Sequence, residues 1–405
     1  MRLSRSRTAI VVYLTAALSV SAGHAAEPGL TSRSAPSQYE ALAKEYDTTY
    51  AAWVKATNEA NHDDNAKVAV SRPAPLDFAP RFFSLAAKNP DDPAAVDALI
   101  WIASHCMFVP EGEKALQILA SKYSRSQRIA AYVAQASRYG EPSAPYEELL
   151  RTVLQQNPNR QAQAAACISL ATYLKMAKEK SESNLIRIAL KGDRSVRPET
   201  LWNLNRLKER GLDQVAAEAE ALFERAIEQY SDVRLNENYP QEAGKFAKEQ
   251  LYELRNLSIG RPSLEFDGKD VEGKAMKLSD YRGQVVVLDF GSHKTCGVCR
   301  AMYPHLRSLV EQYKGKPVAF IGINAFDDLE QLKRLTNDRE ITWRVVWDGD
   351  DEQGPISSRY VIRSMPTIYV LDHKGIIRNK GCLDLTSSDE ISGTVDMLLK
   401  EIPAH

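Results

Sequence analysis

The periodicity of apolar residues changes near Ile259-Gly260-Arg261-Pro262. Before that point, over residues 37–257, apolar residues recur every three or four positions and alanine is abundant. That spacing is typical of amphipathic helices. After it, short apolar runs bounded by turn residues alternate with single helical segments, which indicates an α/β domain with a partly parallel sheet. We therefore expect two domains, an all-α domain over residues 26–258 and an α/β domain over residues 259–405.

The helical half contains a repeat of about 34 residues. Its amphipathic runs end at Asn89-Pro90, Tyr123-Ser124, Asn157-Pro158, Lys191-Gly192 and Tyr230-Ser231. This spacing is close to the helix-hairpin repeat of tetratricopeptide (TPR) solenoids, so we expect TPR-like helical hairpins. Such arrays commonly present a concave surface to a protein partner. The alternative is that the helices only pack together as a scaffold or a dimer surface.

The first residues read as a targeting leader. Arg2, Arg5 and Arg7 precede an uncharged stretch, and small residues then supply a cleavage site after Ala25. We expect residues 1–25 to be a signal peptide and the protein to be exported to the periplasm, with a membrane tether as the alternative if the leader is not cleaved. No later segment reads as a membrane span. Removing three arginines from the 52 basic residues leaves 49 against 53 acidic ones, which gives no indication of a nucleic-acid-binding surface.

Strands and helices alternate in the second half. We expect strands at residues 285–290, 318–323, 343–347, 367–371 and 375–379, and helices at residues 300–313, 329–339 and 388–401. The first of these strands leads directly to a pair of cysteines.

Cys296-Gly297-Val298-Cys299 lies between that strand and the helix after it. At a helix N-terminus the first sulfur meets unpaired backbone N–H groups and the positive end of the helix dipole, which favour the thiolate that attacks in disulfide exchange. The second sulfur is close enough to expel what the first has captured. The alternatives are a static disulfide or zinc ligands, although no second Cys/His pair has a suitable spacing for zinc. We expect no metal and no cofactor beyond this redox-active disulfide.

From about Ile259 the sequence resembles thioredoxin-like domains of the TlpA/ResA and AhpC/TSA type. The resemblance rests on residues 260–266 and 278–285, the CxxC, Pro304 five residues after Cys299, residues 347–349, Met365-Pro366-Thr367 and residues 371–375. A bare CxxC is weak, but CxxC with the helix proline and Met-Pro-Thr about 70 residues later is a specific combination. The resemblance covers the C-terminal third and implies a thioredoxin-like α/β sandwich with a central mixed sheet.

The resemblance also implies a role for each site residue. Cys296 would be the attacking thiolate, and Cys299 would resolve the mixed disulfide. Pro366 would follow a cis peptide bond that leaves the backbone of Met365 free to pair with an extended substrate. Asp289 matches the buried acid of thioredoxins, whose pKa burial would raise and which would accept the proton of Cys299. Alternatively, Asp289 ends a strand and faces water.

The segment before the first cysteine departs from the family. Relatives usually carry Phe-Trp-x-x-Trp-Cys, whereas residues 290–296 here read Phe-Gly-Ser-His-Lys-Thr-Cys. His293, Lys294 and Arg300 would either stabilise the Cys296 thiolate or simply be solvated. Gly-Val also replaces the commoner Gly-Pro between the cysteines, so the redox potential does not carry over from relatives.

The three remaining cysteines lie apart from the CxxC. Five cysteines are too few for a disulfide scaffold in an exported protein of this size. We expect Cys106, Cys167 and Cys382 to be buried as small apolar residues. The alternative for Cys382, which follows the last strand pair, is a third redox thiol near the site.

These features favour an exported thiol-disulfide oxidoreductase that exchanges disulfides with protein substrates and an unidentified redox partner. One alternative is a peroxiredoxin-like peroxidase, which needs Pro-x-x-x-Thr-x-x-Cys where this chain has Asp289 and His293 in place of the proline and the threonine. Another is a helical-repeat interaction protein with a vestigial thioredoxin domain. The helical half would then bind a protein partner by itself.

Overall fold

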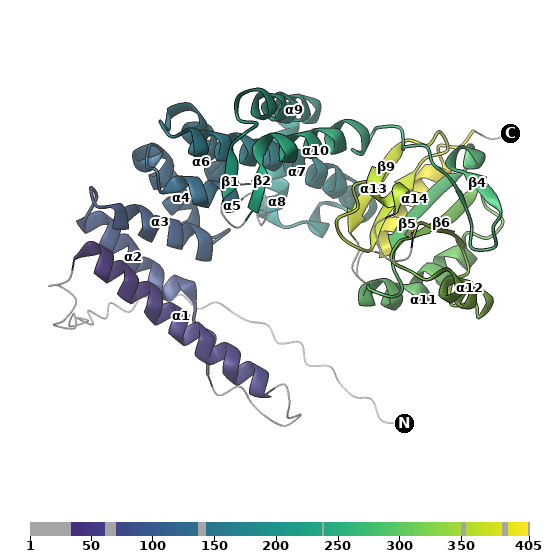
Figure 1. Cartoon of the computed structure of the whole chain (residues 1–405), viewed down its shortest axis with the longest axis horizontal. Helices are drawn as coiled ribbons and strands as arrows, with labels where there is room; N and C mark the ends of the chain where they lie inside the picture. The colour runs from purple at the N-terminus through teal and green to yellow at the C-terminus, as the bar shows by residue number, and fades with distance from the viewer. Residues whose placement is uncertain are drawn as a thin grey trace.

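The structure is a computed structural model that describes residues 34–60, 70–136, 143–236, 239–349, 354–382 and 388–403. The signal peptide expected at residues 1–25 lies outside these ranges. Figure 1 shows an array of helices, coloured purple to teal, beside a sheet-containing part in green and yellow. The expected helical N-terminal part and α/β C-terminal part are therefore both present.

Ten helices build the described N-terminal part. They are α1 (Ala35–Ala60), α2 (Pro75–Lys88), α3 (Pro93–His105), α4 (Pro110–Tyr123), α5 (Ile129–Ala136), α6 (Ala144–Gln156), α7 (Arg160–Lys191), α8 (Pro198–Arg210), α9 (Leu212–Gln229) and α10 (Ala243–Asn256). Several begin with proline in the first turn, where its fixed φ suits a helix and its missing N–H leaves no bond unmade. Asp92 caps α3 and Asn159 caps α7, because each side chain accepts hydrogen bonds from backbone N–H groups of the first turn.

Helix ends fall at the expected repeat boundaries, with one correction inside a repeat. α2, α4, α6, α7 and α9 each end within one residue of a predicted break. Between residues 158 and 191, however, the expected helix hairpin is wrong, and the structure has the single 32-residue helix α7. The helix α7 contains neither glycine nor proline, the two residues that most strongly interrupt a helix.

The N-terminal part is also not purely α-helical. A short antiparallel hairpin, β1 (Arg234–Asn236) and β2 (Tyr239–Glu242), precedes α10. Its register pairs Arg234 with Glu242, two residues of opposite charge that favour each other across strands. The helical periodicity of the flanking segments gave no sign of so short a hairpin.

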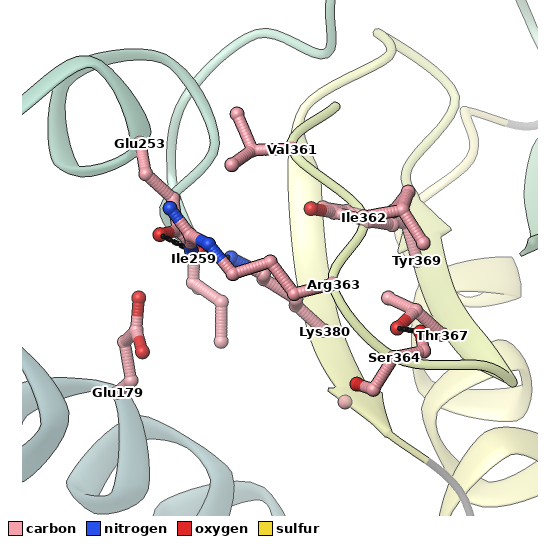
Figure 2. A pocket seen from close by; sticks show the side chains of 11 residues that line it. Glu179, Glu253, Ile259, Val361, Ile362, Arg363, Ser364, Thr367, Tyr369 and Lys380 are labelled. Atoms are coloured by element: carbon pink, nitrogen blue, oxygen red, sulfur yellow. Dashed lines mark hydrogen bonds and ion pairs between the residues drawn. The ribbon is translucent and has the colours of Figure 1, made fainter. Parts of the chain in front are cut away.

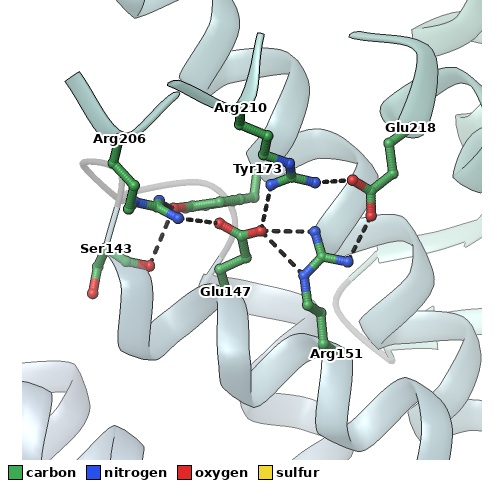
Figure 3. Close-up of polar contacts among 7 residues, drawn as sticks. All are labelled: Ser143, Glu147, Arg151, Tyr173, Arg206, Arg210 and Glu218. Carbon is green, nitrogen blue, oxygen red and sulfur yellow. Dashed lines mark hydrogen bonds and ion pairs between the residues drawn. The ribbon is translucent and has the colours of Figure 1, made fainter. Parts of the chain in front are cut away.

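One buried carboxylate joins α6 to α8 (Figure 3). Glu147 of α6 accepts hydrogen bonds from Arg151, one turn later, and from Arg206 and Arg210 of α8, at 2.7 to 3.1 Å. Glu218 of α9 bonds in turn to Arg151 at 2.6 Å and to Arg210. Burial alone would raise the pKa of Glu147, but hydrogen bonds from Arg151 and Arg206 outweigh it and lower that pKa.

A five-stranded mixed sheet organises the C-terminal part, as expected. Its order is β7-β6-β5-β8-β9. The strands β5 (Val285–Gly291), β6 (Val318–Asn324) and β7 (Arg344–Trp347) are parallel, β8 (Thr367–Leu371) runs antiparallel to β5, and β9 (Ile377–Cys382) runs antiparallel to β8. The strand expected at residues 375–379 begins two residues later and extends to Cys382. A separate hairpin of β3 (Asp267–Lys269) and β4 (Ala275–Lys277) precedes the sheet.

Alternate residues of β5 pack into two different cores. Val285 and Val287 pack with side chains of α11 (Gly297–Gln312), α12 (Leu329–Asn337) and α14 (Ser388–Leu399). Val286 and Leu288 pack with residues of β4 and of α13 (Pro355–Arg359). This alternation follows from the two-residue period of a strand and explains why β5 is apolar along nearly its whole length.

The two parts meet at α7, α10 and α14. α10 ends at Asn256, and Leu257 already packs in the core that contains Phe266 and Phe290. The predicted domain boundary between residues 258 and 259 lies two residues past the end of α10. None of the helices in the described ranges has both the length and the hydropathy needed to cross a membrane.

Candidate functional site

The cysteine pair lies where β5 leads into α11. Cys296 is the N-cap residue of α11, and its Sγ accepts a hydrogen bond from the backbone N–H of Cys299 at 3.1 Å. The two residues form a disulfide with their Cα atoms 5.3 Å apart. Cys296 is half-buried, whereas Cys299 is only 4% exposed. A reaction partner can therefore reach the first sulfur and not the second.

The loop before β8 borders Cys296. The Met365–Pro366 peptide bond is cis, as the resemblance implies. Cys296 Sγ lies 3.5 Å from the carbonyl oxygen of Met365, so the backbone of this loop borders the disulfide. The structure thus brings together Cys296 and Cys299 of the CxxC with Met365 and Pro366 of the Met-Pro-Thr motif.

A groove of about 850 Å³ opens beside the disulfide. It is lined by residues 295–298, by Phe326 and by residues 362–365. Val298, which lines it, is 47% exposed, and the half-buried Phe326 and Met365 add further apolar surface. An exposed apolar groove of this kind suits an extended polypeptide better than a small polar molecule.

Asp289 lies on β5 behind the buried cysteine. Part of its side chain remains accessible, but the carboxyl group is surrounded by protein, and burial raises its pKa to about 7. A Cβ placed on Gly291 would lie 3.8 Å from Asp289 Oδ1 and 3.6 Å from Cys299 Sγ. The carboxyl group of Asp289 and the sulfur of Cys299 therefore both lie beside Gly291. The direction agrees with the raised pKa that the resemblance implies, and a role of Asp289 in proton transfer stays a prediction.

Asp327 holds the loop that replaces the aromatic segment of relatives. It lies after β6, is fully buried, and its carboxylate accepts hydrogen bonds from Ser292 Oγ at 3.1 Å and Asn324 Nδ2 at 2.9 Å. The same carboxylate accepts bonds from the backbone N–H groups of His293 and Lys294, both at 2.8 Å. Charge-assisted hydrogen bonds of this kind fix a loop firmly. Asp327 therefore sets the approach of the chain to Cys296.

The cationic residues near Cys296 have structural contacts of their own. The His293 ring stacks on Tyr303 of α11 with 5.9 Å between ring centroids, and the Arg300 guanidinium donates a hydrogen bond to the carbonyl oxygen of His293. These contacts hold the loop against α11. A contribution to the Cys296 thiolate stays a prediction.

Cys106 and Cys167 are far less suited to exchange than the CxxC pair. Cys106 and Cys167 are buried free thiols, as expected. Burial raises their pKa to about 11 and about 12, so neither supplies thiolate at neutral pH. The backbone of Cys382 pairs with Thr367, next to Pro366, but its side chain lies outside the described residues.

Sequence reasoning did not identify Asp327 or Arg363. Parallel strands β5 and β6 end at the same edge of the sheet, so the segments after them must meet there. An acid in the segment after β6 was therefore a findable partner for residues 292–294. Arg363, two residues before Met365, pairs with Glu253 of the helical part at 2.9 Å. Only the relative placement of the two parts reveals that contact.

Comparisons with known proteins concern the C-terminal part. Residues 259–380 match the AhpC/TSA family. The chain is 29% identical over 132 residues to the thiol-disulfide oxidoreductase ResA of Bacillus cereus, covering 33% of this chain and 71% of that protein. It is 28% identical over 135 residues to the thioredoxin-like protein YneN of Bacillus subtilis, covering 32% of this chain and 76% of that protein.

A solved structure aligns with the same share of the molecule. The thioredoxin domain of a thiol-disulfide oxidoreductase from Bacteroides vulgatus is similar to 36% of this chain and to 100% of its own length, at 22% identity and with a TM-score of 0.30. The resemblance expected from the motifs is confirmed by the family match at residues 259–380.

Proposed function

We propose that this chain is a thiol-disulfide oxidoreductase that exchanges disulfides with protein substrates outside the cytoplasm. The match of residues 259–380 to the AhpC/TSA family and the similarity to the thiol-disulfide oxidoreductase ResA support the proposal. The observation that carries the proposal is the placement of an accessible sulfur, Cys296 Sγ, at a helix N-terminus and against the Met365 carbonyl in an apolar groove. Export rests on the sequence of residues 1–25. An uncleaved leader would instead tether the protein to the membrane.

In the reducing direction, exchange takes two displacement steps. The Cys296 thiolate attacks one sulfur of a substrate disulfide, forming a mixed disulfide and releasing the other substrate sulfur as a thiolate. The Cys299 thiolate then attacks Cys296 Sγ, which forms the Cys296–Cys299 disulfide and releases the second substrate sulfur. The substrate gains two electrons and two protons, and an unidentified dithiol partner restores the reduced enzyme. Oxidation of a substrate dithiol runs through the same steps in reverse.

The surrounding residues serve these steps. The groove and the Met365 backbone hold an extended, apolar stretch of substrate beside Cys296, with Pro366 shaping the turn. Asp289, with its pKa of about 7, accepts the Cys299 proton as that sulfur becomes the nucleophile. The burial of Cys299 keeps it from reacting with outside partners before the mixed disulfide has formed.

Replacement of the first cysteine tests the proposal. Cys296→Ser is expected to abolish both insulin reduction and the oxidation of a model dithiol, because it removes the attacking sulfur. Cys106→Ser, which alters a buried and distant thiol, is expected to retain both activities. Unchanged insulin reduction and dithiol oxidation by Cys296→Ser would show that the assignment is wrong.

The same chemistry separates the proposal from its alternatives. Cys299→Ser should accumulate mixed disulfides with specific proteins. Partners that are retained without any disulfide, through residues 37–257 alone, would instead indicate a helical interaction protein. A peroxidase would consume peroxide in the presence of a thiol donor. The peroxidase motif needs a threonine at position 293, where this chain has histidine. Thr295, the threonine nearest to Cys296 in sequence, instead donates a hydrogen bond from its hydroxyl to Ser292 Oγ at 2.9 Å.

A further inference from the structure

A cavity of about 300 Å³ lies between the helical part and the loop that borders Cys296 (Figure 2). Glu179 of α7 and Glu253 of α10 line it from the helical part, and residues 361–364 and Lys380 line it from the C-terminal part. Residues 362–364 also line the groove beside the disulfide. This short loop is therefore a wall shared by the active-site groove and the cavity between the two parts.

Glu253 is the centre of the charged groups in this cavity. It is 9% exposed, and its Oε2 accepts hydrogen bonds from Lys175 of α7 at 2.6 Å and from Arg363 at 2.9 Å. Its Oε1 accepts a bond from Lys380 of β9 at 2.9 Å. Burial opposes ionisation of Glu253, but the charges of Lys175 and Lys380 outweigh it and hold its pKa well below the usual range. The carboxylate is therefore charged and fully engaged.

The partners of Glu253 lie on both sides of the cis-proline turn. Arg363 comes two residues before Met365. Lys380 pairs in register with Tyr369 of β8, the strand that starts directly after Pro366. One carboxylate of the helical part thus contacts the incoming end of the segment that borders Cys296 and the strand that pairs with its outgoing end.

The physics of buried ion pairs favours a positioning role over a stabilising one. Removing charges from water costs nearly as much as their attraction returns, so such a cluster adds little net stability. Lys175 and Lys380 hold the Glu253 carboxylate in one place, and Arg363, whose side chain is 47% exposed, bonds to it at 2.9 Å. A shifted loop would lose this charge-assisted bond. The cluster therefore fixes the loop at a defined position relative to α10.

We propose that Glu253 is a positioning residue that, through Arg363, sets the loop carrying Met365 and so lets the helical part determine how tightly the Cys296 groove binds polypeptide substrates. The inference rests on the proposed disulfide exchange at Cys296. It assigns to the helical part an effect on substrate affinity that needs no direct contact between that part and the substrate.

Full-length Glu253→Gln and Arg363→Gln test this inference, with Glu220→Gln as a matched control. Glu220 bonds to Arg255 of α10 at 2.7 Å on an exposed surface, so its replacement removes the same charge from the helical part without touching the loop. We expect Glu253→Gln to raise KM for insulin about fivefold and to leave kcat within about twofold. The reaction of reduced Cys296 with a small aromatic disulfide should also stay within about twofold, because it needs no groove.

The double variant separates positioning from direct contact. If Glu253 acts through Arg363, Glu253→Gln combined with Arg363→Gln should have the KM of Arg363→Gln alone. Circular dichroism checks the fold of each variant. Should Glu253→Gln fail to fold, Arg363→Gln carries the test, because it leaves Glu253 with both lysines.

Several outcomes overturn the inference. The inference is wrong if both single variants have a KM for insulin within about twofold of that of the unaltered protein. It is also wrong if Glu253→Gln slows the reaction with insulin and the reaction with the small disulfide by the same factor. An increase in the control as large as that in Glu253→Gln also contradicts it. If the unaltered protein reacts with neither insulin nor the small disulfide, the proposed disulfide exchange itself is wrong. That result differs from the outcomes above, which concern the variants alone.

Discussion

At the scale of single residues, two acids near the disulfide are buried in different ways. Asp327 is surrounded by hydrogen-bond donors, two of them backbone N–H groups of the loop before Cys296. Asp289 has its pKa raised to about 7 by burial. A group that titrates near neutral pH can give up and take back a proton during turnover, whereas a carboxylate with four donors serves to hold structure.

Asp289→Asn is expected to stabilise the protein at pH 8 but hardly at pH 4. The carboxyl ionises near pH 3.8 in the unfolded chain and near pH 7 in the folded protein, so the folded state holds an extra proton between these values. The free energy of unfolding therefore falls as pH rises from about 4 to 7. The asparagine variant avoids this loss, which amounts to up to about 4 kcal/mol at pH 8. Denaturant titrations of the variant and the unaltered protein at pH 4 and pH 8 measure the difference in their free energies of unfolding. The same difference at both pH values would contradict a raised pKa of Asp289.

Motifs located the chemistry of the site but not the groups that position it. Cys296, Cys299, Asp289 and Pro366 belong to short patterns with fixed spacing, and the structure brings them together. Asp327 belongs to no such pattern in this chain, since the loop it holds departs from the family. Its role depends on the parallel pairing of β5 and β6, which a local pattern does not encode.

At the scale of elements, charged side chains as well as apolar ones fix the packing of the helical part. Glu147 of α6 bonds to two arginines of α8 and is only 5% exposed. These residues lie about 60 positions apart, so the network joins helices that are not neighbours in sequence. Each arginine depends on this carboxylate or on Glu218 for its counter-charge.

Glu147→Ala is expected to lower the free energy of unfolding by about 3 to 5 kcal/mol, because it leaves partly buried arginines without their main counter-charge. Glu148→Ala, at the exposed neighbouring position, should change it by less than about 0.5 kcal/mol. Because the pKa of Glu147 is lowered, its contribution is present at neutral pH and is lost as pH falls through the folded-state value. Urea unfolding of both variants at pH 7 measures the difference. If Glu147→Ala and Glu148→Ala lowered the free energy of unfolding by similar amounts, the ion pairs of Glu147 would not stabilise the helical part.

The periodicity of the sequence predicted where helices end better than how they are grouped. Boundaries at residues 89, 123, 157, 191 and 230 carry asparagine, serine, glycine or proline, which end helices for local reasons. The segment from residue 160 to residue 191 matched the repeat length without containing a turn, so repeat length alone suggested a hairpin that the residues do not favour.

At the scale of the whole molecule, the second half of α7 connects the two parts. Glu179 lines the cavity opposite Lys380, and about two turns later Arg187 pairs with Glu390 of α14 at 2.6 Å. Gly393 of α14 comes so close to Leu190 that a Cβ on the glycine would lie 2.6 Å from the leucine side chain. Contacts between residues some 200 positions apart cannot be predicted from local sequence.

Gly393→Val is expected to push α14 from α7 and lower the free energy of unfolding by about 1 to 3 kcal/mol, because the new side chain overlaps Leu190. Leu190→Ala should relieve the overlap, so the double variant should be more stable than Gly393→Val alone. Calorimetry of the three variants measures this. A double variant as unstable as the sum of the singles would show that the two helices do not meet at these residues.

The uninterrupted course of α7 also constrains how this chain can change in length. One residue inserted into an α-helix turns everything beyond it by about 100° and advances it by about 1.5 Å. An insertion midway along α7 would therefore swing Arg187 and Leu190 away from α14, while the first half stayed packed on α6 and α9. Seven added residues, close to two full turns, would restore the direction but move the contacts about 10 Å along the axis. The number of residues in this helix is thus as much a determinant of the architecture as their identity.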